Sequence, residues 1–538
     1  MTEAPLARSN TRSTRKRYRA PTENGGTLID PPLNELVATA ERNRRTAHNS
    51  DQLIADNPIG ELRASLRRWA LEQASTFTNC ETQLPSNLQG CPLFVSGHQP
   101  QLFHPGVWFK NHLLEYLRSK HDGIGLHVII DNDLCTANSI RVPTGTVDAP
   151  VLTNVPFDDA MEWIPFEERT IHNSSLFESF GDRVTSAIAD LVPTPLIQQH
   201  WRIATAAAAV LPNLGFAFSK LRHNIEREWG AQTLEVPLSH LCRSREFHLF
   251  VLHFIRHRAP FVEIYNRSLE EYRRINRIRS RSHPVPPLSI ENEWCELPFW
   301  VWQSSCPRRR ALLVRTSQNT IELTNRSDVW RIENESKTDL FLDRFAELEE
   351  RGIKIRPRAL MTTMFLRLLL SDLFIHGIGG AKYDELTDQI CRELGLVPPA
   401  YACATSTLRL PVEVPADSRN RIRETNQLLR QYRFHPERFI PETESSENQV
   451  SKWIQQKEKW INRKNENREK RLRHAMIEEA NRALQRLLQE KISQAKQNLE
   501  IARHKSQVFD RLGSREFSFV LFPDFELQSR MQCEFSEG

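Results

Sequence analysis

The 538-residue sequence lacks three features that would assign it to a narrow class. Its nine cysteines include no Cys-x-x-Cys pair, which argues against structural zinc and against a disulfide scaffold. No secretory signal opens the chain, and no uncharged apolar run approaches the roughly 20 residues that span a bilayer. We therefore expect a soluble protein of a reducing, cytoplasmic compartment, without a membrane partner.

The sequence also lacks a large excess of positive or negative charge. Lys plus Arg number 72 against 67 Asp plus Glu, so the net charge is only +5 and nucleic acid is not the expected partner. Residues 1–30 carry a short basic run from Arg15 to Arg19 and predict a disordered basic tail. A targeting or nucleic-acid role of this run is the alternative. The 39% hydrophobic content allows a large core and two or three domains.

A polar loop over residues 97–106 separates a short apolar run from a segment with helical spacing. Such a loop joins a strand to a helix, and open α/β sheets bind ligands there because free N–H groups and the helix dipole point to it. The alternative is a tight loop whose polar groups satisfy one another. The candidate residues of this region are Gly97, His98, Gln99, Pro100, His104, Lys110 and Asn111.

Two further polar segments follow apolar runs. Residues 126–130 predict a strand that ends on Asp131 and Asp133, and strand, helix and strand of this length form a parallel βαβ unit. Near residue 375 a third apolar run leads into a glycine-rich loop that lacks the phosphate-loop and dinucleotide fingerprints. We expect all three polar segments at one edge of one sheet. The candidates in the third segment are His376, Gly377, Gly379, Gly380 and Tyr383.

The remaining chain predicts an α/β fold with mid-chain insertions and a helical end. In the insertion we expect helices over 204–218 and 247–278 and a β-rich subdomain over 284–315, whose aromatic residues either stack a ligand or form a core. Residues 446–507 carry a narrow apolar seam typical of an amphipathic helix or helical hairpin, with coiled-coil dimerisation as the expected role. The expected parts are a tail (1–30), the first part of a parallel-sheet core (31–200), the insertion (201–350), the second part of the core (351–440), a coiled coil (441–510), and a closing strand near 517–522 with a tail (511–538).

The three polar segments resemble, in order and composition, those of the bacillithiol biosynthesis cysteine-adding enzymes. Residues 97–106, with the following aromatic residue and Lys110, resemble that family's Gly-Gln-Gln-x-x-Leu-Phe-x-Gly-Pro-x-Tyr signature and later Lys. Residues 131–133 match its acidic turn, and residues 376–383 match its Gly-Gly-Pro-Gly-Glu-x-x-Tyr loop. The resemblance implies a Rossmann-like core, a coiled-coil homodimer, and a ligase-like reaction that joins cysteine to an amino sugar conjugated to malate.

Three positions depart from the family pattern. His98 replaces the first glutamine, the acidic turn keeps two aspartates, and Ala381 stands where the family has Glu. A changed substrate is therefore an open alternative. The His-Gln-Pro segment is also similar to the opening of a family of small proteins linked to sugar biosynthesis and acyl transfer, so an acyl or nucleotidyl transferase is a further alternative.

Amide formation needs an activated acyl group, a base for the amine, and stabilisation of developing charge. We expect His98 or His104 to transfer a proton or stabilise an activated phosphate, and Asp131 or Asp133 to orient an ammonium or hydroxyl group. Lys110 would hold an anionic partner, the glycine loop would hold substrate or a nucleotide such as ATP or ADP, and the substrate would be a thiol or amino sugar. A metal held by His98, His104, Asp131 and His376 is an alternative, but no metal site is expected, because no i, i+4 pair or cysteine cluster anchors that set. The competing hypothesis is a non-catalytic coiled-coil interaction protein on a degenerate enzyme scaffold.

Overall fold

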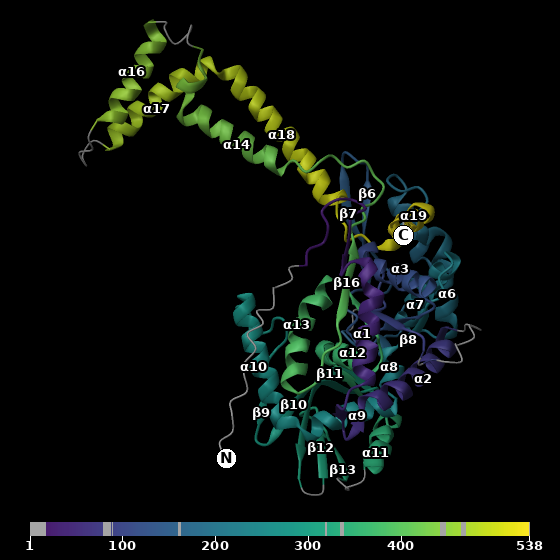
Figure 1. Cartoon of the computed structure of the whole chain (residues 1–538). Coiled ribbons are helices and arrows are strands. Elements are labelled where there is room, and N and C mark those ends of the chain that lie inside the picture. The colour runs from purple at the N-terminus through teal and green to yellow at the C-terminus, as the bar shows by residue number, and fades with distance from the viewer. Residues whose placement is uncertain are drawn as a thin grey trace, which may run out of the picture. The chain divides into compact units, whose positions relative to one another are not determined.

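The computed structural model describes residues 18–78, 88, 90–159, 163–317, 320–333, 338–441, 448–463 and 470–536. It is a mixed α/β structure, drawn in Figure 1. The chain forms two compact units: unit 1 comprises Met1–Val142, Asn154–Leu408 and Arg515–Gly538, and unit 2 comprises Pro143–Thr153 and Arg409–Ser514. The boundary at residue 408 lies before the predicted one at 440, because the helix that follows it packs within unit 2.

Unit 1 is built on a six-stranded sheet. Neighbouring strands in its order are β1 (Thr27–Asp30), β16 (Tyr401–Ser406), β15 (Leu373–His376), β4 (Leu93–His98), β5 (Ile124–Ile129) and β8 (Leu234–Pro237). All neighbours are parallel except β1 and β16, which pair antiparallel. The sheet is therefore mixed, with one antiparallel edge strand.

The predicted strand, helix and strand around the first polar loop is confirmed. Helix α3 (Pro105–Lys120) connects β4 to β5, and the two strands are parallel with Ser96 beside His127. Numbered along the chain, the five parallel strands run 3-2-1-4-5 across the sheet, so the order reverses between β4 and β15. In open α/β sheets this reversal opens a crevice at the carboxyl ends of the two strands. Here those ends are His98 and His376.

A second sheet is antiparallel. Its order is β13 (Val329–Glu333), β12 (Thr320–Thr324), β11 (Cys306–Thr316), β10 (Trp294–Gln303) and β14 (Ile353–Pro357), with β9 (Ile290–Glu291) also on β10. The predicted β-rich region is thus present but longer than expected, and β14 comes from beyond the predicted insertion. Buried residues of both sheets, such as Val95 and Phe299, belong to one hydrophobic core. The insertion is therefore integrated into unit 1.

Helices of the insertion break where local chemistry requires it. The helix predicted over 204–218 is two helices, α6 (Leu196–Val210) and α7 (Leu214–Glu228). Pro212 between them lacks an N–H group, and the Asn213 side chain caps α7 by accepting from Phe216 N at 2.9 Å. The helix predicted over 247–278 is likewise divided into α9 (Arg245–Arg256) and α10 (Arg258–Asn276).

Two predictions near the ends of the chain are wrong. Residues 18–30, assigned to the disordered tail, are ordered: β1 extends the sheet, and Tyr18 Oη donates to Asp30 Oδ2 at 2.6 Å. Residues 1–17 lie outside the described part. The closing strand near 517–522 is a 3-10 helix, Phe519–Leu521, because its backbone bonds to loops: Phe519 N donates to Phe103 O at 2.8 Å.

The remaining elements of unit 1 surround these sheets. Helix α3 contacts β4, β5 and β16, whereas α2 contacts β8 and α12 contacts β15. Their bounds, with the other short elements, are α1 (Leu36–His48), α2 (Ile59–Thr78), α4 (Ser174–Glu178), α5 (Phe180–Ile188), α8 (Leu238–Leu241), α11 (Thr338–Glu350), α12 (Ala359–Leu369), α13 (Ile378–Glu393), α19 (Asp524–Ser536), the pair β2 (Leu53–Ile54) and β3 (Asn57–Pro58), and the 3-10 helices Leu33–Glu35 and Phe166–Glu168. The hairpin of β6 (Ser139–Gly145) and β7 (Pro150–Pro156) runs across the division between the units.

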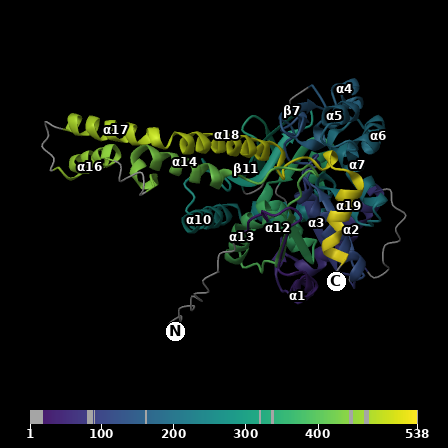
Figure 2. The same ribbon diagram turned by 90° about the horizontal axis from the view of Figure 1, so that it is seen from above.

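Unit 2 is mainly helical. Its helices are α14 (Arg419–Phe434), α16 (Asn448–Asn462), α17 (Lys470–Leu487) and α18 (Gln489–Leu512), with a 3-10 helix at Pro436–Phe439. Helix α14 packs along α18 and α16 along α17, as Figure 2 shows. Part of the predicted apolar seam is buried within these pairs, where Val450, Leu484 and Leu488 cluster with Tyr432 of α14. Ile461 and Leu487 of the seam are exposed. The observed pattern is therefore paired helices within one chain.

Among the described helices, none combines the length and the apolar character that crossing a bilayer requires.

Candidate functional site

A cavity of about 830 Å³ opens in unit 1 at the carboxyl ends of β4 and β15. Its volume is within the range of ligand pockets. It lies where the strand order reverses, and the three predicted polar segments meet there. The sequence-predicted residues that line it are Gly97, His98, Gln99, His104, Lys110, Asp133, His376, Gly377, Gly379, Gly380 and Tyr383.

Three predicted residues lie elsewhere. Asp131 accepts from Ser239 N at 3.0 Å and from Ser239 Oγ at 2.5 Å, and it lines a different cavity. Asn111 Nδ2 donates to Glu226 Oε1 at 2.7 Å, because one helical step past Lys110 turns its side chain away. Pro100 packs toward Gly215, where an added Cβ would lie 3.1 Å from its Cγ. Contrary to the prediction, none of these three residues lines the first cavity.

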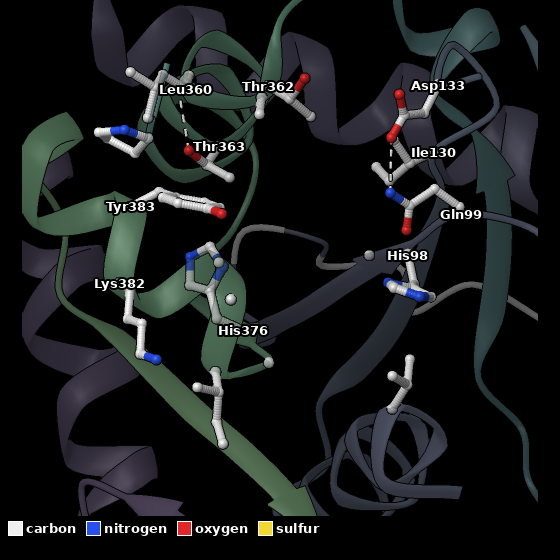
Figure 3. A pocket seen from close by; sticks show the side chains of 18 of the residues that line it. His98, Gln99, Ile130, Asp133, Leu360, Thr362, Thr363, His376, Lys382 and Tyr383 are labelled. Carbon is white, nitrogen blue, oxygen red and sulfur yellow. Dashed lines mark hydrogen bonds between the residues drawn. The ribbon is translucent and has the colours of Figure 1, made fainter. Parts of the chain in front are cut away.

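His98 lines the cavity with a neutral imidazole ring. Burial, together with the nearby Lys110, holds its pKa well below the ordinary value for histidine. Its ring meets Phe103 edge to face, with 5.2 Å between centroids. Figure 3 shows His98 across the cavity from His376. A neutral imidazole in this place can donate or accept a hydrogen bond with a ligand.

His104 caps the amino end of helix α3. Its Nδ1 accepts from Gly106 N at 3.1 Å at the start of α3, and its Nε2 lies 3.4 Å from Glu516 Oε2. Burial lowers its pKa, although Glu516 acts in the opposite direction. Because capping uses Nδ1, only Nε2 can reach a ligand.

Asp133 orients its neighbours. Gln99 Nε2 donates to Asp133 Oδ2 at 2.7 Å, a bond drawn in Figure 3, and Arg309 Nη1 donates to Oδ1 at 2.9 Å. Both carboxylate oxygens therefore have partners inside the chain. The geometry suits a residue that positions Gln99 and Arg309 better than one that accepts a proton.

Trp300 is an aromatic residue of the insertion that lies at the candidate ligand site. It lines the cavity, and the guanidinium carbons of Arg309 and Arg358 lie over its ring at 4.8 and 4.2 Å from the centroid. The ring thus supports two cations. Arg358 is also held by Glu296 at 2.8 Å.

His376 is joined to a buried acidic residue that the sequence reasoning missed. Its Nε2 lies 2.6 Å from Asp384 Oδ2. Thr363 Oγ1 donates to Asp384 Oδ1 at 2.7 Å, and Arg367 Nη1 donates to Oδ2 at 2.8 Å. Arg367 and the neighbouring imidazole hold the pKa of Asp384 well below its usual range. The sequence contains one indication of this contact. Gly380 and Asp384 are four residues apart, so they lie on the same face of a helix.

Lys110 is buried beneath the first loop. Its Nζ donates to Gly97 O at 2.8 Å, and burial lowers its pKa to about 8. At neutral pH a share of Lys110 is therefore unprotonated. This residue can donate to an anion or take up a proton.

The cavity is rich in cationic side chains. Asp133 and Glu516 are its two acidic lining residues, whereas the cationic ones are Arg19, Lys110, Arg309, Arg358, Lys382 and Arg515. This excess favours an anionic ligand. Arg19 and Arg515 come from the two ends of the chain, so no local pattern could have placed them here.

The structure groups three possible metal ligands away from this cavity: His223, Glu226 and Glu235. Arg222 already forms ion pairs with both glutamates, at 3.0 Å and 2.5 Å. A metal cation would compete with that guanidinium, so the two glutamates act as ion-pair partners of Arg222.

A comparison with models of protein families finds no match to this chain, and a comparison with curated proteins finds none either.

Proposed function

We propose that unit 1 is an enzyme that forms a carbon–nitrogen amide bond, like the cysteine-adding enzymes that its motifs resemble. One observation supports this proposal most strongly. Three loops that are distant in sequence surround one cavity where the strand order reverses, and His98 and His376 face this cavity. The proposed substrates are the carboxyl group of cysteine and the amine of an amino sugar linked to malate, or close relatives of these.

The chemistry assigns a role to each side of the cavity. The amine nitrogen attacks the activated acyl carbon, a new C–N bond forms, and the bond from that carbon to the leaving group breaks. His376, oriented by Asp384, takes the proton that the amine loses. The leaving group departs with the electron pair of the broken bond, and Lys110 stabilises its negative charge.

The anionic part of the substrate is assigned to the cationic wall. Arg309 and Arg358 are fixed on Trp300 and by ion pairs, so little side-chain entropy is lost when they bind a carboxylate or phosphate. Gly377 and Gly379 have open space where a Cβ would lie, which lets a ligand approach the start of α13.

The finer parts of the resemblance are also proposals. They are a Rossmann-like core, activation of the acyl group by ATP, a cytoplasmic location and a homodimer formed through the helices of unit 2 as a coiled coil. Exposed Leu487 on α17 and Ile501 on α18 support an apolar contact there. Sedimentation of the full chain and of a Leu487→Lys, Ile501→Lys variant tests the dimer, which should dissociate in the variant.

A direct test incubates the full chain with cysteine and glucosaminyl-malate, with and without ATP, and measures the condensed product by mass spectrometry. The double variant His98→Ala, Asp133→Ala should lose product while nearly keeping the wild-type melting temperature. His376→Ala should lose product and also some stability, because it leaves buried Asp384 without this contact. His474→Ala, an exposed histidine of unit 2, is the matched control and should keep full activity. Thiol profiling of the host with and without the gene extends the test to the natural substrate.

The result also separates the enzyme from a non-catalytic interaction protein. If the cavity variants are silent in the host while deletion of residues 446–507 removes the phenotype, the enzyme proposal is wrong. If an acyl or nucleotidyl transfer product appears in place of the amide, the reaction type is wrong but the site stands.

A further inference from the structure

Unit 1 contains a second cavity, of about 420 Å³, that the proposed function does not use. The turn after β5 contributes Asp133 to the first cavity and Asp131 to the second. Pro237 at the end of β8 and Ser219 on α7 also line the second cavity. It is therefore a separate space at the carboxyl ends of β5 and β8.

Three polar atoms around this cavity lack partners. Glu167 Oε1, Ser219 Oγ and His240 Nδ1 are buried and have no hydrogen-bond partner among the described residues. The side chain of Glu167 is only 9% exposed. Buried polar atoms are normally paired, so three unpaired ones on a single cavity indicate a missing ligand.

The three atoms have a common capacity. A carboxylate oxygen and a hydroxyl oxygen both accept hydrogen bonds, and so does Nδ1 of a neutral imidazole. Burial lowers the pKa of His240 to about 4, so this ring is neutral at physiological pH. A primary ammonium group has three N–H donors, which matches three acceptors.

The surrounding charges favour a cation as well. Three carboxyl groups line the cavity, Asp131, Glu167 and Glu168, against the two cations Arg243 and Lys354. Behind this lining, Glu349 pairs with Lys354 at 2.9 Å and with Arg356 at 2.8 Å, and Glu167 Oε2 accepts from Arg356 at 3.1 Å. One negative charge is left over in the lining when its three carboxyl groups are ionised.

Glu167 absorbs that excess when the cavity holds no cation. Burial, reinforced by Asp131, Glu168 and Glu349 and opposed by Arg356, raises its pKa to about 8. An ammonium ion beside Glu167 would favour the ionised carboxylate and release its proton. The apolar part of a ligand would meet Phe77 and Phe216, whose rings are 5.9 Å apart and edge to face.

We propose that this second cavity binds a small primary amine as its ammonium ion, held by Glu167, Ser219 and His240, with its apolar body against Phe77 and Phe216. This site is independent of the proposed amide-forming reaction. Loss of one function by mutation should leave the other unchanged.

Calorimetric titration of the full chain with benzylamine tests the proposal, and benzyl alcohol is the uncharged probe of equal size. Benzylamine should bind at least about tenfold more tightly than the alcohol, and its affinity should rise from about pH 6.5 to about pH 8.5 as Glu167 ionises. Glu167→Gln should lower benzylamine affinity by about tenfold or more and remove the pH dependence, and Ser219→Ala should lower it severalfold.

Lys382→Met, in the first cavity, is the matched control and should leave benzylamine binding unchanged. Equal binding of amine and alcohol, absence of amine binding at millimolar concentration, or full binding by Glu167→Gln would each overturn the proposal. The Gln variant matches the size and neutrality of the protonated carboxyl group, so it should fold, and its melting temperature checks this. Loss of amide formation in Lys382→Met with intact benzylamine binding would separate the two sites.

Discussion

Asp384 holds His376 through a 2.6 Å contact between Oδ2 and Nε2, and both side chains are buried. The other ring nitrogen, Nδ1, faces Gly380 at the start of α13. This arrangement fixes the ring at the wall of the cavity, as the carboxylate does in other histidine–carboxylate pairs. The pair links a buried ion-pair network, through Arg367 and Thr363, to the place where ligand would lie.

Asp384→Asn should lower kcat by about 100-fold or more and change KM little, because the amide no longer stabilises the imidazolium that forms on proton uptake. Steady-state kinetics of product formation measures kcat and KM.

Asp388→Asn is the control for Asp384. Asp388 also pairs with Arg367, at 2.6 Å, but it has no contact with His376 among the described interactions. This variant should keep the wild-type kcat and KM. Equal losses in the two variants would show that the acidic residues only support the fold.

Gly380→Ala should disturb the histidine directly. An added Cβ would lie 2.5 Å from His376 Nδ1, so the ring must move. We expect a loss of about 1–3 kcal/mol in the free energy of unfolding, together with most of the activity. Urea unfolding and product formation measure the two effects.

Gly379→Ala provides the matched comparison one residue earlier. No atom lies within 4 Å of its added Cβ, and alanine favours the helix over glycine. Stability should stay the same or rise by about 0.5–1 kcal/mol. If both alanine variants lose the same stability, crowding of His376 is not the cause of that loss.

Local patterns explain which parts of this site were predictable. The apolar run before His98 leads into a loop with Gly97 and Gly106, and the run before His376 leads into a loop that begins with Gly377. A helical repeat follows each loop, so strand, loop and helix could be read directly. The parallel pairing of β4 and β5 followed from the length of the connection. These features depend on neighbours in sequence.

The missed features depend on distant partners. Asp131 faces away from the first cavity because Ser239, 108 residues later, binds its carboxylate. Tyr18 and Arg515 reach the cavity from opposite ends of the chain. The 3-10 helix at Phe519–Leu521 is fully buried, and an apolar run of this kind does not distinguish a strand from other buried segments.

Asp372 should stabilise the pairing of β4 and β15 at their amino ends. Its carboxylate accepts from Leu93 N at 2.9 Å and pairs with Arg63 at 2.9 Å and with Arg67. Asp372→Ala leaves two buried cations without their partner and should cost about 3–5 kcal/mol in the free energy of unfolding. Glu271→Ala removes an exposed pair with Arg274 on α10 and should not change urea unfolding measurably. A small loss for Asp372→Ala would contradict the assigned role.

Lys110→Met should raise stability while it removes function. Burial lowers the folded-state pKa of Lys110 to about 8, whereas lysine in an unfolded chain has a pKa of about 10.4. Protonated Lys110 therefore lowers the free energy of unfolding below pH 8, and this penalty disappears as pH rises from about 8 to about 10.4. After allowance for the lost bond to Gly97 O, the variant should be about 2 kcal/mol more stable than wild type near pH 7. The stability difference should vanish or reverse near pH 10.4 in urea unfolding.

A pH-independent stability difference would mean that Lys110 does not titrate in this range. Retained product formation in Lys110→Met would show that Lys110 has no role in the reaction.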